Sequence, residues 1–209
     1  MSAKKLSDKL IKEASKIAAA TMHEAAGKVG ALPAAIKPVK DGFKICGRAF
    51  PVKGKGGDNV WLHRALAKAG KGDVLVADVS GVYEYGYWGD VMTTAARARG
   101  IAGLVINGCV RDKFEIIEAG FPVFCRGFAI RGTGKDFEGP GFIDQPLDMD
   151  GVTINPGDLI LGDDDGVIAM PAARVAEVIE KSHAREKKEQ ETMAQLRKGK
   201  TTMQIYGWK

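Results

Sequence analysis

The sequence lacks any hydrophobic run long enough to cross a membrane. Its first 20 residues, MSAKKLSDKLIKEASKIAAA, spread their charges throughout instead of flanking an apolar centre. A membrane span needs about 20 apolar residues, and a secretory signal needs an apolar centre behind a basic start. Because neither pattern is present, we expect a cytoplasmic protein with no membrane partner.

The sequence has few cysteines, and neither sign of charge dominates it. The three cysteines, Cys46, Cys109 and Cys125, are odd in number and show no CxxC spacing, so neither a disulfide framework nor a zinc knuckle is indicated. The 31 Lys and Arg residues are interspersed with 26 Asp and Glu residues, leaving a formal charge of only +5. Without a continuous basic stripe, nucleic acid is not an indicated partner.

The middle of the chain alternates apolar runs with amphipathic stretches. Segment 43–54 alternates apolar and polar residues and predicts a strand, and the apolar runs that predict buried strands are 71–79, 101–108 and 121–130. The stretches that predict helices between them are 60–70, 89–100 and 112–120. This alternation is typical of parallel βαβ units.

The two ends of the chain differ from this core. Apolar residues at helical spacing predict a helix over 4–20, and TMHEAAGKVGAL (21–32) predicts a second short helix that ends at Gly27 or Gly30. Segment 151–171 has short apolar runs separated by NPGD and DDDG turns, which predict β-hairpins. From Ala172 onward, acids and bases alternate, which predicts a long charged helix with a frayed end. We therefore predict one α/β domain over residues 1–209, with a βαβ core, a β-hairpin layer and helices at both termini.

Two short pairs, Gly89-Asp90 and Arg111-Asp112, follow neighbouring predicted strands. Ligands of such folds bind at the carboxyl ends of the strands. The backbone N–H groups at the start of helix 89–100 can hold a carboxylate, and Arg111 can pair with a carboxylate or an enolate oxygen. Asp112 is a hard oxygen ligand suited to Mg²⁺ or Mn²⁺. The alternative is that Asp90 caps a helix and that Arg111 and Asp112 form a structural ion pair.

Four other features allow weaker hypotheses. GKGGDN (54–59) lacks the ending of a phosphate-binding P-loop, so we expect a turn whose amides help to cradle an anion. His63 is expected to be a packed or capping histidine. Cys109 is either an activated thiolate or a small residue at a strand end. Lys113 is an alternative nucleophile that would form a Schiff base with a keto acid.

The segment GYWGDVMTTAARARGIAGLVINGCVRD (86–112) resembles the signature of the RraA-like family. More narrowly, it resembles the 4-hydroxy-4-methyl-2-oxoglutarate/4-carboxy-4-hydroxy-2-oxoadipate aldolases. AATMHEAAG, KGDVLVADV and INPGDLILGDDDGVIAMP match in the same order, so the resemblance covers most of the chain. It implies a single-domain swivelling β/β/α fold that assembles as trimers or pairs of trimers. Active sites would lie between subunits, with 172–209 packed on a neighbour.

The resemblance also implies roles for individual residues. The substrate-binding residues would be Gly89, Asp90, Val91, Met92 and Arg111. Asp112 would anchor the divalent metal, Mg²⁺ or Mn²⁺. A glutamate from a neighbouring subunit's last helix would complete the site, with Glu189 the best match and Glu186 and Glu191 as alternatives.

The reaction implied is cleavage of a 4-hydroxy-2-oxo acid to pyruvate and a second 2-oxo acid. Arg111 would hold the enolate, Asp90 would move protons through a water molecule, and Glu189 would take part from the neighbour. Oxaloacetate decarboxylation is expected through the same pyruvate enolate. The alternative is the family's regulator branch, which binds ribonuclease E without catalysis. That branch does not keep the acid after the arginine, so Asp112 favours the enzyme.

Overall fold

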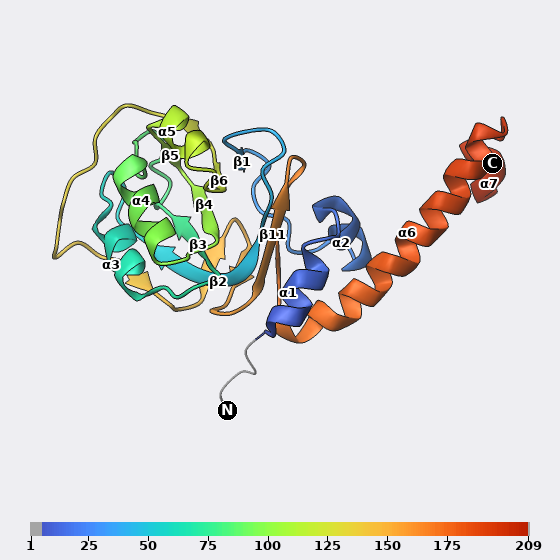
Figure 1. Cartoon of the computed structure of the whole chain (residues 1–209), viewed down its shortest axis with the longest axis horizontal. Helices are drawn as coiled ribbons and strands as arrows, with labels where there is room; N and C mark the ends of the chain where they lie inside the picture. Colours follow the sequence, from blue (N-terminus) through green and yellow to red (C-terminus); the bar gives the residue numbers. More distant parts are fainter. Residues whose placement is uncertain (1–5, 209) are drawn as a thin grey trace.

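The computed structural model describes residues 6–208, and an eight-stranded sheet organises them (Figure 1). The sheet order is β1-β6-β4-β3-β2-β11-β12, with β8 paired to β2. The mutually parallel strands are β2 (Ile45–Lys53), β3 (Asp73–Asp78), β4 (Gly103–Asn107) and β6 (Val123–Cys125). The antiparallel strands are β1 (Lys37–Pro38), β8 (Phe142–Ile143), β11 (Leu159–Asp163) and β12 (Gly166–Met170).

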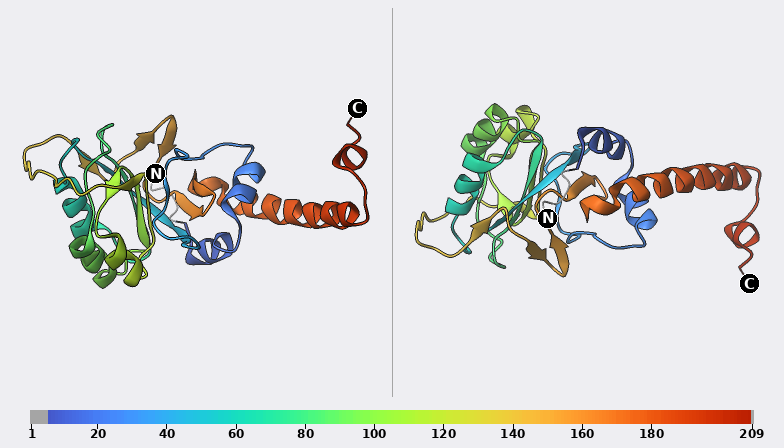
Figure 2. Two further views of the ribbon diagram at one scale, coloured as in Figure 1. Left: turned by 90° about the horizontal axis from the view of Figure 1, so that it is seen from above. Right: turned by 90° about the horizontal axis from the view of Figure 1, so that it is seen from below.

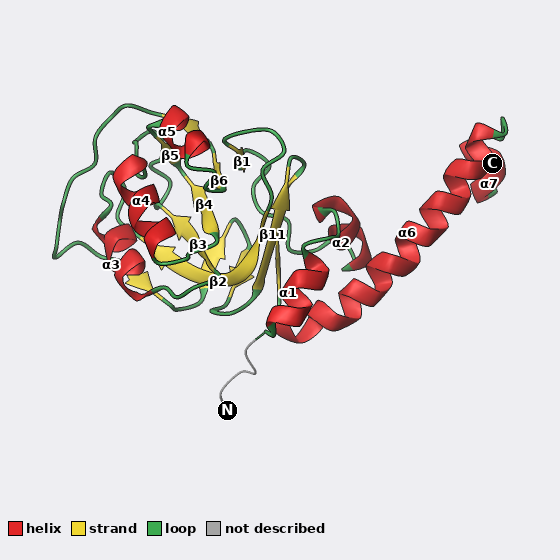
Figure 3. Ribbon diagram, viewed as in Figure 1, coloured by secondary structure: helices red, strands yellow, loops and turns green. Residues whose placement is uncertain are grey.

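Three helices cover one face of the parallel strands (Figure 3). They are α3 (Val60–Lys68), α4 (Asp90–Ala98) and α5 (Lys113–Glu118), which follow β2, β3 and β4 in turn. Side chains alternate along β3, so Leu75 and Ala77 pack against these helices while Val74 and Val76 face the opposite core. The predicted βαβ units are confirmed.

The other face of the sheet is closed by β-structure. Hairpin β9 (Leu147–Met149) to β10 (Val152–Ile154) packs there, and β1 approaches β12, so that the sheet is nearly closed. Strand β11 serves two cores, because Ile160 joins this inner cluster while Leu159 and Leu161 pack against the terminal helices. The DDDG segment forms the tight turn between β11 and β12, as predicted.

The terminal helices pack on the outer side of β11 and β12. They are α1 (Asp8–Ala14), α2 (Ala19–Ala25), the 3₁₀ turn η1 (Ala172–Arg174), α6 (Val175–Arg197) and α7 (Thr202–Tyr206). The first part of α6 lies against α2, and its remainder extends away from the body (Figure 2). No helix within 6–208 is long and apolar enough to cross a membrane.

The boundary between the two N-terminal helices differs from the prediction. The first helix, predicted over 4–20, ends at Ala14, and the second begins at Ala19, where a distant carboxylate caps it: the Ala19 N–H donates to Asp163 Oδ2 at 2.8 Å. Residues 4 and 5 of the predicted helix lie outside the described residues. The second helix stops at Ala25, just before Gly27, which is one of its two predicted ends; Gly27 and Lys28 have positive φ angles of 87° and 62°.

Two further boundaries differ from prediction. The strand expected over 121–130 is divided into β6 and β7 (Gly127–Phe128), and β7 pairs with β5 (Cys109–Val110) outside the main sheet. Arg126 separates them, and its Nε donates to Asn107 Oδ1 at 2.6 Å. The segment that follows α6 is not frayed over Thr202–Tyr206, because a Thr201–Gln204 capping box starts the separate helix α7.

Candidate active site

The two pairs singled out in the sequence are in direct contact. The Asp90 N–H donates to Asp112 Oδ2 at 3.0 Å, and the Arg111 N–H donates to the Trp88 carbonyl at 2.8 Å. Arg111 Nε lies 3.7 Å from Asp112 Oδ2, which is a loose ion pair with both side chains partly exposed. Asp112 therefore fixes the start of α4, while the Arg111 guanidinium stays open to the solvent side.

This close approach requires glycine at position 89. A Cβ built on Gly89 would lie 2.2 Å from Asp112 Oδ2 and 3.2 Å from Arg111 Cγ. Its φ of −156° is extended backbone that any residue adopts, so space rather than backbone freedom is the constraint. Gly86 is similar, since its Cβ would lie 2.6 Å from the Ala129 carbonyl oxygen.

Asp112 has a strained backbone. Its φ of 57° and ψ of 45° are left-handed values, which cost a non-glycine residue about 1–3 kcal/mol. It stands at the N-cap position of α5 but does not cap that helix. Its hydrogen bonding within the described chain uses Oδ2 alone, for the Asp90 N–H. This backbone conformation accompanies a carboxylate that faces α4 and whose Oδ1 has no hydrogen bond within residues 6–208.

Two buried aromatic residues anchor the loop that carries Gly89. The Trp88 ring stacks on Phe121 at 6.1 Å, and its Nε1 donates to Thr93 Oγ1 at 2.8 Å. Tyr87 Oη accepts from the Gly57 N–H at 2.7 Å, and burial is the main cause that raises the pKa of Tyr87. Neither aromatic side chain is exposed, so the loop is fixed before any ligand binds.

A row of polar side chains, bonded to one another, lies at the carboxyl ends of the strands below this loop. Asn107 Nδ2 donates to Asp78 Oδ2 at 3.0 Å, Lys53 pairs with Asp78, and Arg126 donates to Asn107. Asp78 and Asn107 are buried. Since these groups satisfy one another, the row is structural support and not a ligand site.

An open pocket of about 340 Å³ lies beside the contact of the two pairs. It is lined by Asn59, His63, Gly86, Tyr87, Gly89, Val91, Met92, Arg111, Asp112, Gly132, Thr133 and Lys135. The structure thus brings Gly89, Val91, Met92, Arg111 and Asp112 to one cavity. Half-buried Asp90 stands at the first position of α4 and is not part of that lining.

The helix start differs in detail from the prediction that all its amides face a substrate. The Asp90 N–H is taken by Asp112. The N–H groups of Val91 and Met92 precede the first hydrogen bond of the helix, which Thr93 N–H donates to the Gly89 carbonyl at 3.0 Å. Helix geometry leaves these two amides without an intrahelical acceptor, so they can hold an anion.

The sequence analysis missed the opposite wall of the pocket. Asn59, His63, Thr133 and Lys135 line it, from the glycine-rich turn before α3, from α3 itself and from the loop after β7. His63 was expected to be only packed or capping. Its pKa is lowered, mainly by burial and then by the positive charge of Lys135. The available signal was the glycine-rich composition of both turns at the carboxyl edge of the strands.

The structure does not support three of the weaker hypotheses. In the GKGGDN turn the Gly57 N–H donates to Tyr87 Oη and the Asp58 N–H to the Lys55 carbonyl, so these two amides do not cradle an anion. Burial raises the pKa of the Cys109 thiol, which argues against an activated thiolate. Lys113 lies 4.8 Å from the centre of the Phe128 ring and does not line the pocket.

The family described as RraA-like, Aldolase/RraA, matches residues 3–169. The chain belongs to this family. A protein of Halalkalibacterium halodurans that is provisionally named a 4-hydroxy-4-methyl-2-oxoglutarate aldolase is 38% identical over 151 residues, which cover 72% of this RraA-like chain and 71% of the relative.

Solved structures show the same fold. An uncharacterised protein from Pseudomonas syringae pv. tomato has a TM-score of 0.84 and 29% identity, covering 98% of this chain and 97% of that one. The RNA-processing inhibitor RraA from Thermus thermophilis has a TM-score of 0.65 and 28% identity, covering 73% and 92%. The RraA-like fold predicted from the sequence is confirmed, with a nearly closed mixed sheet and helices at both ends.

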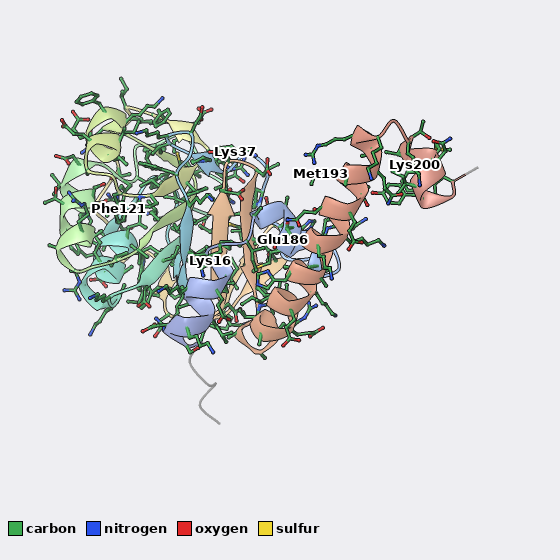
Figure 4. The ribbon with its side chains drawn as sticks, turned by 45° about the vertical axis from the view of Figure 1, so that its right-hand side comes forward. Lys16, Lys37, Phe121, Glu186, Met193 and Lys200 are labelled. Carbon is green, nitrogen blue, oxygen red and sulfur yellow. The ribbon has the colours of Figure 1, made fainter. Side chains whose placement is uncertain are left out.

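Glu189 of this RraA-like chain lies outside the pocket. It is on α6, where its Oε1 lies 2.8 Å from Arg185 Nε. Helix α6 leaves the body on the side opposite α3, α4 and α5 (Figure 1). In Figure 4, Met193 on α6 and Lys200 just after this helix lie farther from the body than Glu186. Glu189 and its alternatives therefore do not meet Asp112 within one chain.

Proposed function

We propose that this RraA-like protein is a divalent-metal-dependent (class II) aldolase. It would cleave 4-hydroxy-4-methyl-2-oxoglutarate or 4-carboxy-4-hydroxy-2-oxoadipate to pyruvate and a second 2-oxo acid. The observation that carries the proposal is the Asp112 carboxylate, with one oxygen fixed by α4 and the other unbonded, beside Arg111 in an open pocket. The provisional name of the Halalkalibacterium halodurans relative supports the same chemistry.

Mg²⁺ or Mn²⁺ fits the donor at Asp112. Within residues 6–208, no group of three or more His, Cys, Asp or Glu side chains is arranged to hold a metal. Mg²⁺ does not need such a group, because it is commonly held by one or two carboxylates and several waters. When bound, the ion would act as a Lewis acid that polarises the 2-keto group.

The chain's own residues would orient the substrate. The free N–H groups of Val91 and Met92 lie at the positive end of α4 and would bind the carboxylate next to the keto group. The Arg111 guanidinium would hold the keto oxygen, where negative charge develops as the enolate forms. Gly89 allows both contacts, because it brings the α4 start against Asp112.

Proton movement is assigned to Asp90. Acting through a water molecule, its carboxylate would accept the proton of the C4 hydroxyl while the C3–C4 bond breaks. The bonding electron pair passes to the pyruvate half as the enolate, and a proton returned to C3 gives pyruvate. Oxaloacetate that loses CO₂ leaves the same enolate, so decarboxylation would use the same residues.

A neighbouring subunit would complete the site. We assign this role to Glu189, with Glu186 and Glu191 as the alternatives, in a trimer or a pair of trimers. The direction of α6, which leads away from its own pocket, supports donation to another copy (Figure 2). Two measurements test this assignment: the molar mass in solution and the activity of Glu189→Gln. A protein that is monomeric and fully active would contradict it.

The test is pyruvate release from the two 4-hydroxy diacids and from oxaloacetate. Activity should stop with EDTA and return with Mg²⁺ or Mn²⁺. Asp112→Asn should abolish it, whereas Asp41→Asn, on an exposed loop residue, should not. Turnover that survives chelation, or an active Asp112→Asn variant, overturns the proposal.

A second candidate is a non-catalytic regulator of ribonuclease activity. The likeness to the RNA-processing inhibitor from Thermus thermophilis favours it. It predicts inhibition of a ribonuclease E-type enzyme by stoichiometric binding, together with no pyruvate release. Turnover without ribonuclease binding would exclude this candidate.

A further inference from the structure

The pocket contains two cations that come from different loops. Arg111 follows β4 and has Asp112 beside it. Lys135 lies in the long loop after β7 and is exposed, and its Nζ donates to neutral oxygens: Asn59 Oδ1 at 2.5 Å, Thr133 Oγ1 at 3.4 Å and the Gly134 carbonyl at 3.5 Å. No carboxylate of residues 6–208 lies within ion-pair distance of Lys135.

The backbone on both sides of Lys135 is held in place. The Gly134 N–H donates to the Gly57 carbonyl at 2.8 Å, and the Asp136 N–H donates to Asp58 Oδ2 at 2.6 Å. Asn59 is buried, and its Nδ2 donates to the Tyr87 carbonyl at 2.9 Å, which turns Oδ1 toward Lys135. The ammonium group is therefore positioned by its surroundings.

Neighbouring basic groups cannot replace Lys135. Lys55 is paired with Asp136 at 2.8 Å. The Arg64 guanidinium lies 4.3 Å from the Trp61 ring centre and donates to a carbonyl of the loop. The lowered pKa of His63 favours its neutral form. Lys135 is thus the cation without a charged partner on this wall.

We propose that Lys135 binds a second carboxylate of the substrate and that Asn59 positions it. The pocket would then select 2-oxo acids that carry a carboxylate at both ends. This inference rests on the proposed aldolase function and deepens it. A substrate with a methyl group in place of that carboxylate would lack this ion pair and would bind more weakly.

The interaction acts on binding more than on the chemical step. In aldol cleavage the second carboxylate keeps its charge in the product, so Lys135 stabilises substrate and transition state alike. Because Lys135 is exposed, loss of this ion pair predicts an effect of about 2- to 5-fold. The effect should appear in KM and leave kcat nearly unchanged.

The kinetic test compares 4-hydroxy-2-oxoglutarate with 4-hydroxy-2-oxopentanoate, in which a methyl group replaces the second carboxylate. Wild type should prefer the diacid about 2- to 5-fold in kcat/KM, and Lys135→Met should abolish that preference through the KM of the diacid alone. Asn59→Ala should weaken it, and the control Lys55→Met should retain it. A Lys135→Met variant that retains the preference overturns the inference and leaves the aldolase proposal standing.

A binding test separates the two proposals. Calorimetry with Mg²⁺ compares 2-oxoglutarate with 2-oxopentanoate on wild type and Lys135→Met. A preference of wild type for the diacid that disappears in the variant supports the inference, even if no substrate releases pyruvate and the aldolase proposal falls. Equal affinity of wild type for both acids, or binding of neither, overturns it.

Discussion

Gly89→Ala should separate the start of α4 from Asp112 without disturbing the backbone at position 89. Alanine adopts a φ of −156° and a ψ of −163° freely. Its Cβ would lie 2.2 Å from Asp112 Oδ2, whereas ordinary contact begins near 3.4 Å, so the carboxylate must retreat by about 1.2 Å. The retreat breaks the bond from the Asp90 N–H. We expect a loss of about 1–3 kcal/mol in unfolding free energy and at least about tenfold in pyruvate release.

A double-mutant cycle identifies the cause. Asp112→Ala removes the atom that obstructs the new Cβ, so Gly89→Ala in that background should cost less than about 0.5 kcal/mol in urea unfolding. The matched control is Gly132→Ala, in the same pocket, where a Cβ meets nothing within 4 Å. Equal costs of Gly89→Ala with and without the Asp112 carboxylate would refute the reasoning.

Three other predictions concern stability and reactivity. Asp163→Ala should lower unfolding free energy by about 1 kcal/mol by removing the cap on Ala19, while Asp163→Asn should retain most of it; equal losses in both would contradict this. Tyr87→Phe should cost about 1–3 kcal/mol, because the backbone N–H and carbonyl that its hydroxyl bridges lose their partner; an unchanged urea midpoint would contradict it. Burial raises the pKa of Cys46 to about 12 and that of Cys125 to about 11. At pH 8 both should therefore react with a thiol reagent far more slowly in the folded than in the unfolded protein, and equal rates would contradict this.

The local sequence pattern was sufficient to predict those helices and strands whose formation depends on their own residues. Strands β3 and β4 and helix α4 follow the predicted stretches, because each is a continuous apolar or amphipathic segment between glycines. The position of the break between α1 and α2 was not predictable in this way. It depends on Asp163, which lies 144 positions from Ala19 and caps it across the fold.

The residues of the candidate site also fall into two groups: those that a local sequence pattern identifies and those that depend on contacts across the fold. Gly89, Arg111 and Asp112 could be found because each follows a recognisable strand at the carboxyl edge of the sheet. Lys135 could not, because its place in the pocket depends on a bridge between Asp58 and Gly134 across the fold. No period or short motif in the loop encodes that pairing.

The left-handed backbone of Asp112 sets two opposing contributions to stability at one residue. Glycine adopts φ near 57° without the steric penalty that a side chain brings, so Asp112→Gly should be more stable than Asp112→Ala by about 1 kcal/mol. Both variants would lose the carboxylate and the bond that it accepts from the Asp90 N–H. Glycine at position 112 would therefore relieve the backbone but release the start of α4, whereas aspartate supplies both that bond and a carboxylate in the pocket lining.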